Sequence, residues 1–253
     1  MRNKNTLFIG KVFLHFQSLE STNQYALDLI SKSKPIEGTV ISTFNQTKGR
    51  GQIGSNWESS VDKNITISLI LYPTFVAIQQ QFILNQIISL AVKDWLLNHT
   101  SKVVKVKWPN DIYINDKKIA GILIQNSISG KKIGSTVIGM GININQESFP
   151  KDLPNATSLH IETNQSFDLN NLIEELCFYL EVRYLQLKQN QLQKINQDYL
   201  RSLYKYQEVA SFERIETGEI FTGMIQGISS YGKLQIEHNK GLEEFDLKEI
   251  TFK

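Results

Sequence analysis

Apolar and polar positions along the chain follow two periods, one typical of strands and one typical of helices. Strands are predicted around 12–14, 38–44, 64–71, 103–107, 112–124 and 132–144. Helices are predicted from Ser21 or Thr22, through Ile83 to Trp95, through Leu172 to Leu187, and on to about Tyr204. Strict alternation at 64–71, ended by Pro73, predicts a half-buried strand. The polar, basic residues 1–11 predict a frayed lead-in to the first strand.

After Tyr204 the pattern changes to short strands at 208–214, 221–228, 233–237 and 243–247, separated by single glycines. This spacing predicts a small β-barrel. A unit of about fifty residues is near the lower limit for a core of its own, so we expect it to pack on the larger domain. We place the domain boundary between residues 1–206 and 207–253.

Composition excludes several classes of protein. The 253 residues carry 27 Lys and Arg against 25 Asp and Glu, a balance of +2 that gives no strong basic field for nucleic acid or membrane surfaces. The single Cys177 excludes an intrachain disulfide and predicts a buried thiol in a reducing compartment. Four scattered His residues argue against a zinc site, and no run approaches ~18 apolar residues. We therefore expect a soluble, cytoplasmic protein without a membrane segment.

The stretch from Lys107 to Asp111 combines a cation, an indole, an amide and a carboxylate around Pro109, a corner that can direct several polar groups at one point. Behind it, 112–114 and 119–124 form a predicted β-hairpin that turns at Asn115 and Asp116. Lys118 then lies at the mouth of a buried strand. Taken singly, Lys117 and Lys118 are typical of solvated hairpin charges and Trp108 is typical of an ordinary core residue.

A cationic, glycine-rich loop runs from Asn45 to Trp57. Gly49, Gly51 and Gly54 match G-x-G-x-x-G, but Trp57 and a polar turn follow in place of an apolar helix, which argues against a dinucleotide fold. Backbone N–H groups and Arg50 can instead close over a phosphate.

Two further segments have both a structural and a functional interpretation. Ser21, Thr22 and Asn23 suit a helix cap as well as a binding site. The glycines at 139 and 141 can bring backbone close to a ligand beside Asn143, or mark only a β-bulge.

Together these motifs resemble those of the biotin protein ligases, in the family's order and over nearly the whole chain. The matching segments are Glu20-Ser21-Thr22-Asn23, Gln46-Thr47-Lys48-Gly49-Arg50-Gly51 with Trp57, Lys107-Trp108-Pro109-Asn110-Asp111, Lys118-Ile119-Ala120-Gly121-Ile122-Leu123, Gly139-Met140-Gly141-Ile142-Asn143 and Ala156-Thr157-Ser158-Leu159.

The resemblance implies an α+β fold: a class II synthetase-like catalytic domain with a mixed β-sheet and flanking helices, followed by an SH3-like C-terminal β-barrel. It also implies two half-reactions. Biotin and MgATP would give biotinyl-5′-AMP and pyrophosphate, and the adenylate would then acylate a lysine of a biotin carboxyl carrier protein.

Roles carried onto the matching positions are expectations from the resemblance. Biotin would be bound by Ser21, Thr22, Asn23, Gln46, Gly49, Arg50, Gly51, Lys118 and Gly121. ATP or the adenylate would be bound by Arg50, Trp57, Lys107, Asn110 and Asn143. Lys118, Arg50 and Asp111 would carry the catalysis, and Asp111 is the candidate ligand for Mg²⁺.

The residue types suit this chemistry independently of the family. A carboxylate that attacks an α-phosphate is already ionised at neutral pH, so the first step needs cations and amides in place of a base. A carrier lysine must lose a proton before it can attack. Asp111 is the acid within the motif cluster, and orienting that amine competes with metal binding as its role.

Two features depart from family patterns. Many members have a basic residue where this chain has Gln52, which puts one phosphate contact, and the retention of the adenylate, in doubt. Members that repress transcription carry a winged-helix domain before the catalytic domain, whereas the motifs here begin by Glu20, so we expect no specific DNA binding.

Two alternative functions remain open at this point. A lipoate ligase shares the fold and the adenylate chemistry, although the Gly-Arg-Gly loop favours biotin. A nucleic-acid-binding or adaptor protein built around the barrel is the alternative from another class, kept open by Lys233, Lys240 and Lys248. The sequence leaves open the identity of the carrier, a homodimer or monomer, and what the barrel contacts.

Overall fold

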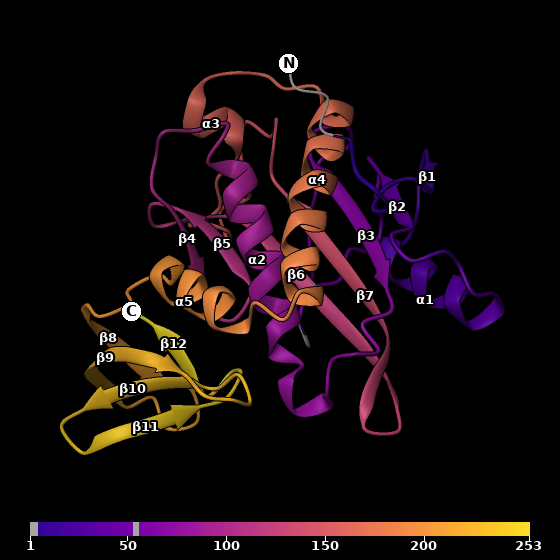
Figure 1. The fold of residues 1–253 in the computed structure, drawn as a ribbon. Helices are drawn as coiled ribbons and strands as arrows, with labels where there is room; N and C mark the ends of the chain where they lie inside the picture. Colours follow the sequence, from indigo (N-terminus) through magenta and orange to yellow (C-terminus); the bar gives the residue numbers. More distant parts are fainter. Residues whose placement is uncertain (1–4, 53–55) are drawn as a thin grey trace.

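A seven-stranded mixed sheet forms the centre of the larger part of the molecule (Figure 1). The computed structural model describes residues 5–52 and 56–253. The sheet contains β1 (Phe13–Phe16), β2 (Val40–Thr43), β3 (Ile65–Leu71), β4 (Val104–Lys107), β5 (Asp111–Ile114), β6 (Lys117–Ser129) and β7 (Lys132–Ile142), in the order β1-β2-β3-β7-β6-β5-β4. Only the β1–β2 pair is parallel, and the other described neighbours are antiparallel.

The strand predicted to be half-buried is buried on both faces. All seven residues of β3 are buried, polar Thr66 and Ser68 included. The prediction from alternation was wrong because β3 lies inside the sheet between β2 and β7, with the main core on one face and α1 (Thr22–Lys32) against Ile70 and Ser68 on the other.

Helices cover the two faces of the sheet unequally. On one face α2 (Phe82–Leu96) packs against α4 (Leu169–Lys188), and α5 (Leu192–Ser202) follows beside them, as Figure 1 shows. On the other face α1 (Thr22–Lys32) packs alone over β2, β3 and β7. Helix α1 begins at the predicted cap, Ser21, and Cys177 on α4 is buried and unpaired as predicted. A short helix, α3 (Leu159–Thr163), was not predicted.

The segment before β1 is anchored, so its predicted fraying is wrong for the described residues. The backbone N–H groups of Leu7, Phe8 and Ile9 donate to the buried carboxylate of Glu181 over 2.6 to 2.9 Å, and Ile9 is fully buried. The polar composition of this segment predicted fraying because it gives no sign of the acceptor, Glu181, which lies on α4 far along the chain.

The C-terminal residues form a separate five-stranded antiparallel sheet, at the lower left of Figure 1. Its strands are β8 (Val209–Arg214), β9 (Ile220–Ile228), β10 (Leu234–His238), β11 (Gly241–Phe245) and β12 (Ile250–Phe252), in the order β11-β10-β9-β8-β12. The last strand was not predicted because it has three residues. This sheet packs on the larger domain as expected, with the Trp108 indole N–H donating to the Gly232 carbonyl over 2.9 Å. The predicted α+β fold class is confirmed.

Candidate functional site

The site lies on the face of the sheet that α1 covers only in part. Along β3, Ile70 packs under α1, Ser68 contacts the first residues of the helix, and Thr66 lies beyond it. Along β7, Val137 packs under α1, Gly139 meets Asn23 at the start of the helix, and Gly141 lies beyond it. Because alternate residues of a strand share a face, small and polar residues line the uncovered part of this face. A floor of this kind leaves room for a ligand.

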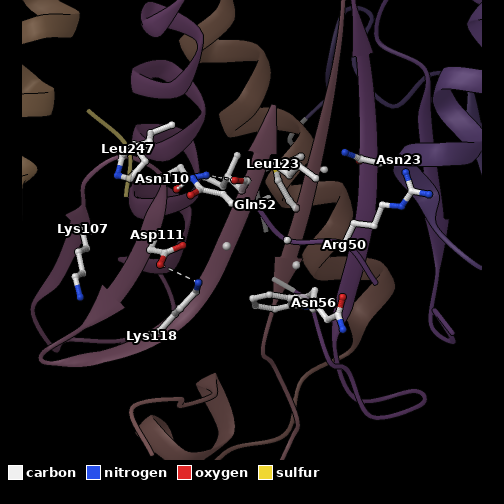
Figure 2. A pocket seen from close by; sticks show the side chains of 18 of the residues that line it. Asn23, Arg50, Gln52, Asn56, Lys107, Asn110, Asp111, Lys118, Leu123 and Leu247 are labelled. Carbon is white, nitrogen blue, oxygen red and sulfur yellow. Dashed lines mark hydrogen bonds and ion pairs between the residues drawn. The ribbon is translucent and has the colours of Figure 1, made fainter. Parts of the chain in front are cut away.

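A cavity of about 310 Å³ opens over this floor, and Figure 2 shows its walls. It is within the size range of small-molecule sites. All but two of the predicted site residues line it: Ser21, Thr22, Asn23, Gln46, Arg50, Gly51, Trp57, Lys107, Asn110, Asp111, Lys118 and Gly121. Gly49 and Asn143 do not.

One end of the cavity is polar and uncharged. Gln46 Oε1 accepts from the Thr22 backbone N–H at 2.9 Å. The Ser68 hydroxyl donates to Asn23 Oδ1 at 2.5 Å, and its oxygen lies 2.8 Å from Thr22 Oγ1. Asn23 Nδ2 donates to Gln125 Oε1 at 3.1 Å. Ser68 and Gln125 hold predicted binding residues in place and were missed, since their strands show no polar motif.

The glycines at 121, 139 and 141 make room for two side chains. A Cβ on Gly139 would overlap the Asn23 amide, and a Cβ on Gly141 would overlap the Trp57 indole. A Cβ on Gly121 would lie 3.0 Å from Trp57 Cζ3. The bulge interpretation of Gly139 and Gly141 is wrong, because β7 keeps a regular register with β3 and β6 at both positions.

Lys118 reaches the cavity from the start of β6. Its ammonium pairs with the Asp111 carboxylate at 2.8 Å, a contact drawn in Figure 2. A β-bulge at Ile119 leaves Lys118 on the same face as Gly121, whose Cβ would lie 3.5 Å from Lys118 Cε. Bulges commonly redirect a side chain beside a site in this way. Lys117 is exposed.

The backbone of Lys118 is fixed by the segment after β7. Its N–H donates to the Asn155 carbonyl at 2.7 Å, and its carbonyl accepts from the Thr157 N–H at 2.9 Å. The Thr157 carbonyl also accepts from Asn143 Nδ2 at 3.0 Å. Asn143 and the Ala156 motif therefore act behind the cavity, in support of Lys118.

Lys107 lies at the other end of the cavity. Its ammonium is 3.3 Å from the Tyr113 hydroxyl oxygen, 5.0 Å from the centre of the Tyr113 ring and 4.9 Å from that of Phe252. Burial lowers the pKa of Lys107, and the Asp111 carboxylate partly offsets this.

The glycine-rich segment is hydrogen-bonded to the cavity wall at two described residues. Gln52 Nε2 donates to Asn110 Oδ1 at 2.9 Å, and the Asn110 amide donates to the Ile122 carbonyl. Arg50 Nη1 donates to Gln24 Oε1 on α1 at 2.8 Å, and Figure 2 shows the guanidinium directed away from Lys118. The predicted Gly54 lies outside the described residues. Gly49 approaches the Trp57 carbonyl so closely that no side chain fits there.

Charge divides the cavity into two ends. Its wall contains four cations, Arg50, Lys107, Lys118 and Lys248, and one carboxylate, Asp111. The cationic end can neutralise a polyanion, whereas the end around Thr22 suits an uncharged hydrogen-bonding group.

Comparisons with known proteins agree with this geometry. Residues 15–143 match the biotin/lipoate A/B protein ligase family, and residues 212–250 match the biotin protein ligase C-terminal domain. The chain belongs to the biotin protein ligase family. This membership favours an enzyme over the adaptor alternative.

Individual relatives cover most of the chain. The bifunctional ligase/repressor BirA of Bacillus subtilis is 30% identical over 94% of this chain and 73% of its own length. The biotin–[acetyl-CoA-carboxylase] ligase of Mycobacterium tuberculosis is 30% identical over 86% of this chain and 80% of its own. The biotin protein ligase of Aquifex aeolicus, solved in complex with biotin and ATP, has the same fold, with a TM-score of 0.79 at 23% identity over 96% and 99% of the two chains.

Neither a metal cluster nor a membrane-spanning helix is present in the part of the chain that the structure describes. Within residues 5–52 and 56–253, no three His, Cys, Asp or Glu side chains gather as a metal cluster. No helix in the same ranges is long and apolar enough to cross a bilayer.

Proposed function

We propose that this chain activates biotin with ATP as biotinyl-5′-AMP and transfers the biotinyl group to a specific lysine of a biotin carboxyl carrier domain. The cavity carries this proposal, because one cavity brings a group of neutral hydrogen-bonding side chains together with four cations and one carboxylate on its wall. Biotin has a neutral ureido ring at one end and a carboxylate at the other, and the nucleotide adds the phosphates.

The first half-reaction follows from this polarity. Thr22 and Gln46 are positioned to hydrogen-bond the ureido ring, which directs the biotin carboxylate toward Lys118. A carboxylate oxygen attacks the α-phosphorus of ATP, and the bond to the β-phosphate oxygen breaks with release of pyrophosphate. Negative charge gathers on the α-phosphate in the transition state, where the Lys118 ammonium stabilises it. Asp111 holds that ammonium in place at 2.8 Å.

The second half-reaction needs a neutral amine. The carrier lysine, ordinarily protonated at neutral pH, loses a proton and attacks the biotinyl carbonyl, and AMP leaves with the bonding electrons. Asp111 is the carboxylate on the cavity wall that can accept or orient that proton once the ligand's phosphate has drawn Lys118 away.

Asp111 would also contact Mg²⁺. Mg²⁺ that arrives bound to a nucleotide is usually held by the phosphates and by one or two protein carboxylates. The single carboxylate of Asp111 on the cavity wall fits that requirement. When bound, the ion neutralises phosphate charge.

Biotin is preferred to lipoate as the substrate in this proposal. The amide and hydroxyl groups of Gln46, Thr22 and Ser68 can hydrogen-bond a ureido ring in addition to one another, whereas the apolar dithiolane of lipoate offers them no such bond. The match to a biotin ligase C-terminal domain supports the same choice.

Mass spectrometry tests the proposal. A carrier domain of a biotin-dependent carboxylase, incubated with the protein, biotin and MgATP, should gain the mass of one biotinyl group on one lysine. The same mixture with lipoate in place of biotin is the control. If pyrophosphate were released with lipoate but not with biotin, the substrate would be lipoate. If it were released with neither, the proposed function would be wrong.

We also propose that the two domains meet between residues 206 and 207. The chain crosses at this point from α5 into β8, and the backbone N–H of Gln207 already donates to the Ile225 carbonyl of the C-terminal sheet at 3.2 Å.

A further inference from the structure

The C-terminal sheet forms part of the cavity wall. Six of its residues line the cavity: Ile215, Leu247, Lys248, Ile250, Thr251 and Phe252. They lie at the cationic end, beside Lys107. The bond from the Trp108 indole to the Gly232 carbonyl joins the sheet to the segment that follows β4.

The point of contact is an aromatic pair around one ammonium. Phe252 of β12 and Tyr113 of β5 place their ring centres 4.9 and 5.0 Å from Lys107 Nζ. The cross-strand neighbour of Lys107, Asp111, pairs with Lys118 instead. Burial lowers the pKa of Lys107, and the charge of Asp111 partly offsets this. The two ring faces add a direct contact that also favours the charged ammonium.

We propose that Phe252 is a positioning residue for the nucleotide: it holds the Lys107 ammonium, together with Tyr113, where the phosphates of ATP bind. The inference rests on the function proposed above. It gives the C-terminal sheet a direct part in the first half-reaction, through one ring of its last strand. A desolvated cation–π contact is worth up to about thirtyfold in an equilibrium constant.

Phe252 also packs against Phe212 of its own sheet, with ring centres 5.1 Å apart, and against Tyr204 of the larger domain at 6.0 Å. A test must separate this packing from the contact with Lys107. Phe221 supplies the matched control, because it stacks on the same Phe212 at 5.6 Å but lies over Arg214 within the sheet.

The experiment compares Phe252→Leu, Phe252→Met and Phe221→Leu in the full chain, with KM for ATP and for biotin measured by pyrophosphate release. We expect both Phe252 variants to raise KM for ATP roughly tenfold and to leave KM for biotin unchanged. Phe252→Tyr, which keeps a ring face, should retain the wild-type value. Phe221→Leu should lower the melting temperature without the change in KM.

A double-mutant cycle with Lys107→Gln tests the route of the effect. If Phe252 acts through Lys107, Phe252→Leu should add little to the KM of Lys107→Gln. Additive increases in KM for ATP, or equal increases in Phe252→Leu and Phe221→Leu, would overturn the inference. The proposed function would still stand if the wild-type protein turns over. Wild-type protein that forms no biotinyl-AMP would instead count against the function itself, and isothermal titration of ATP into the same variants would still test the Phe252 contact.

Discussion

Gln52 donates a hydrogen bond of 2.9 Å to Asn110, across the cavity wall from the glycine-rich segment to the turn before β5 (Figure 2). The sequence resemblance led us to expect a basic residue at the position of Gln52, and a neutral side chain bonded to the protein lies there. The segment is thereby tied to Asn110, whose own amide donates to the Ile122 carbonyl.

Loss of this bond should shorten the lifetime of the bound adenylate. A hydrogen bond of this kind contributes about 1 kcal/mol, so Gln52→Ala should speed dissociation of pre-made biotinyl-AMP roughly fivefold. Lys48→Ala is the control, because its exposed pair with Glu20 contributes little. Equal dissociation rates for Gln52→Ala and wild type would show that the bond to Asn110 does not retain the ligand.

Arg50 should matter more than Gln52 because it is charged. Its guanidinium donates to Gln24 on α1, so it must turn to reach a phosphate beside Lys118. Arg50→Gly should weaken retention of the adenylate about tenfold or more and let it acylate bystander lysines, which mass spectrometry of added albumin would detect. Arg50→Lys should recover part of the loss.

Gln24→Ala separates the two positions of Arg50. It frees the guanidinium from α1 without removing its charge, so adenylate retention should stay at or above that of wild type. If Gln24→Ala weakened adenylate retention as much as Arg50→Gly does, the Arg50–Gln24 bond would be what retains the ligand, and a contact of Arg50 with the phosphate would not be.

Lys118 should carry most of the charge stabilisation in the first half-reaction. A preorganised donor at such a site contributes roughly 2.7–4 kcal/mol, so Lys118→Gln should slow adenylation about a hundredfold to a thousandfold. Transfer from pre-made biotinyl-AMP should suffer less. Exposed Lys117 is the matched control, and Lys117→Gln should leave adenylation near the wild-type rate. Equal losses in the two variants would refute the assignment.

Substitution of the cavity-floor glycines should be more damaging at Gly141 than at Gly121. Gly141→Ala overlaps the Trp57 indole, whereas Gly121→Ala only approaches it, at 3.0 Å from Cζ3. We expect Gly141→Ala to displace Trp57, shift its fluorescence toward the red and reduce biotin binding, with a smaller effect for Gly121→Ala. Spectra in a Trp57→Phe background should show neither shift. A larger effect from Gly121→Ala would contradict the packing described here.

The sequence by itself determined the order and type of most elements and the chemical character of the site. Amphipathic spacing located α2 and α4, and the turn at Asn115, where φ is 53°, located the β5–β6 hairpin. Both depend on neighbours a few positions apart, which periodicity records. Motif residues such as Thr22 and Lys118 were recognisable because their types suit the chemistry.

Only the tertiary structure decided which distant residues support that chemistry. The bulge at Ile119 directs Lys118, the carboxylate of Glu181 anchors the first residues, and the ring of Phe252 reaches Lys107 from the last strand. None of these follows from local pattern, because each depends on how separate elements pack and on register shifts that leave hydrophobic periodicity unchanged. The burial of β3 was mispredicted for the same reason: alternation describes one strand, whereas burial depends on what covers both faces of the sheet.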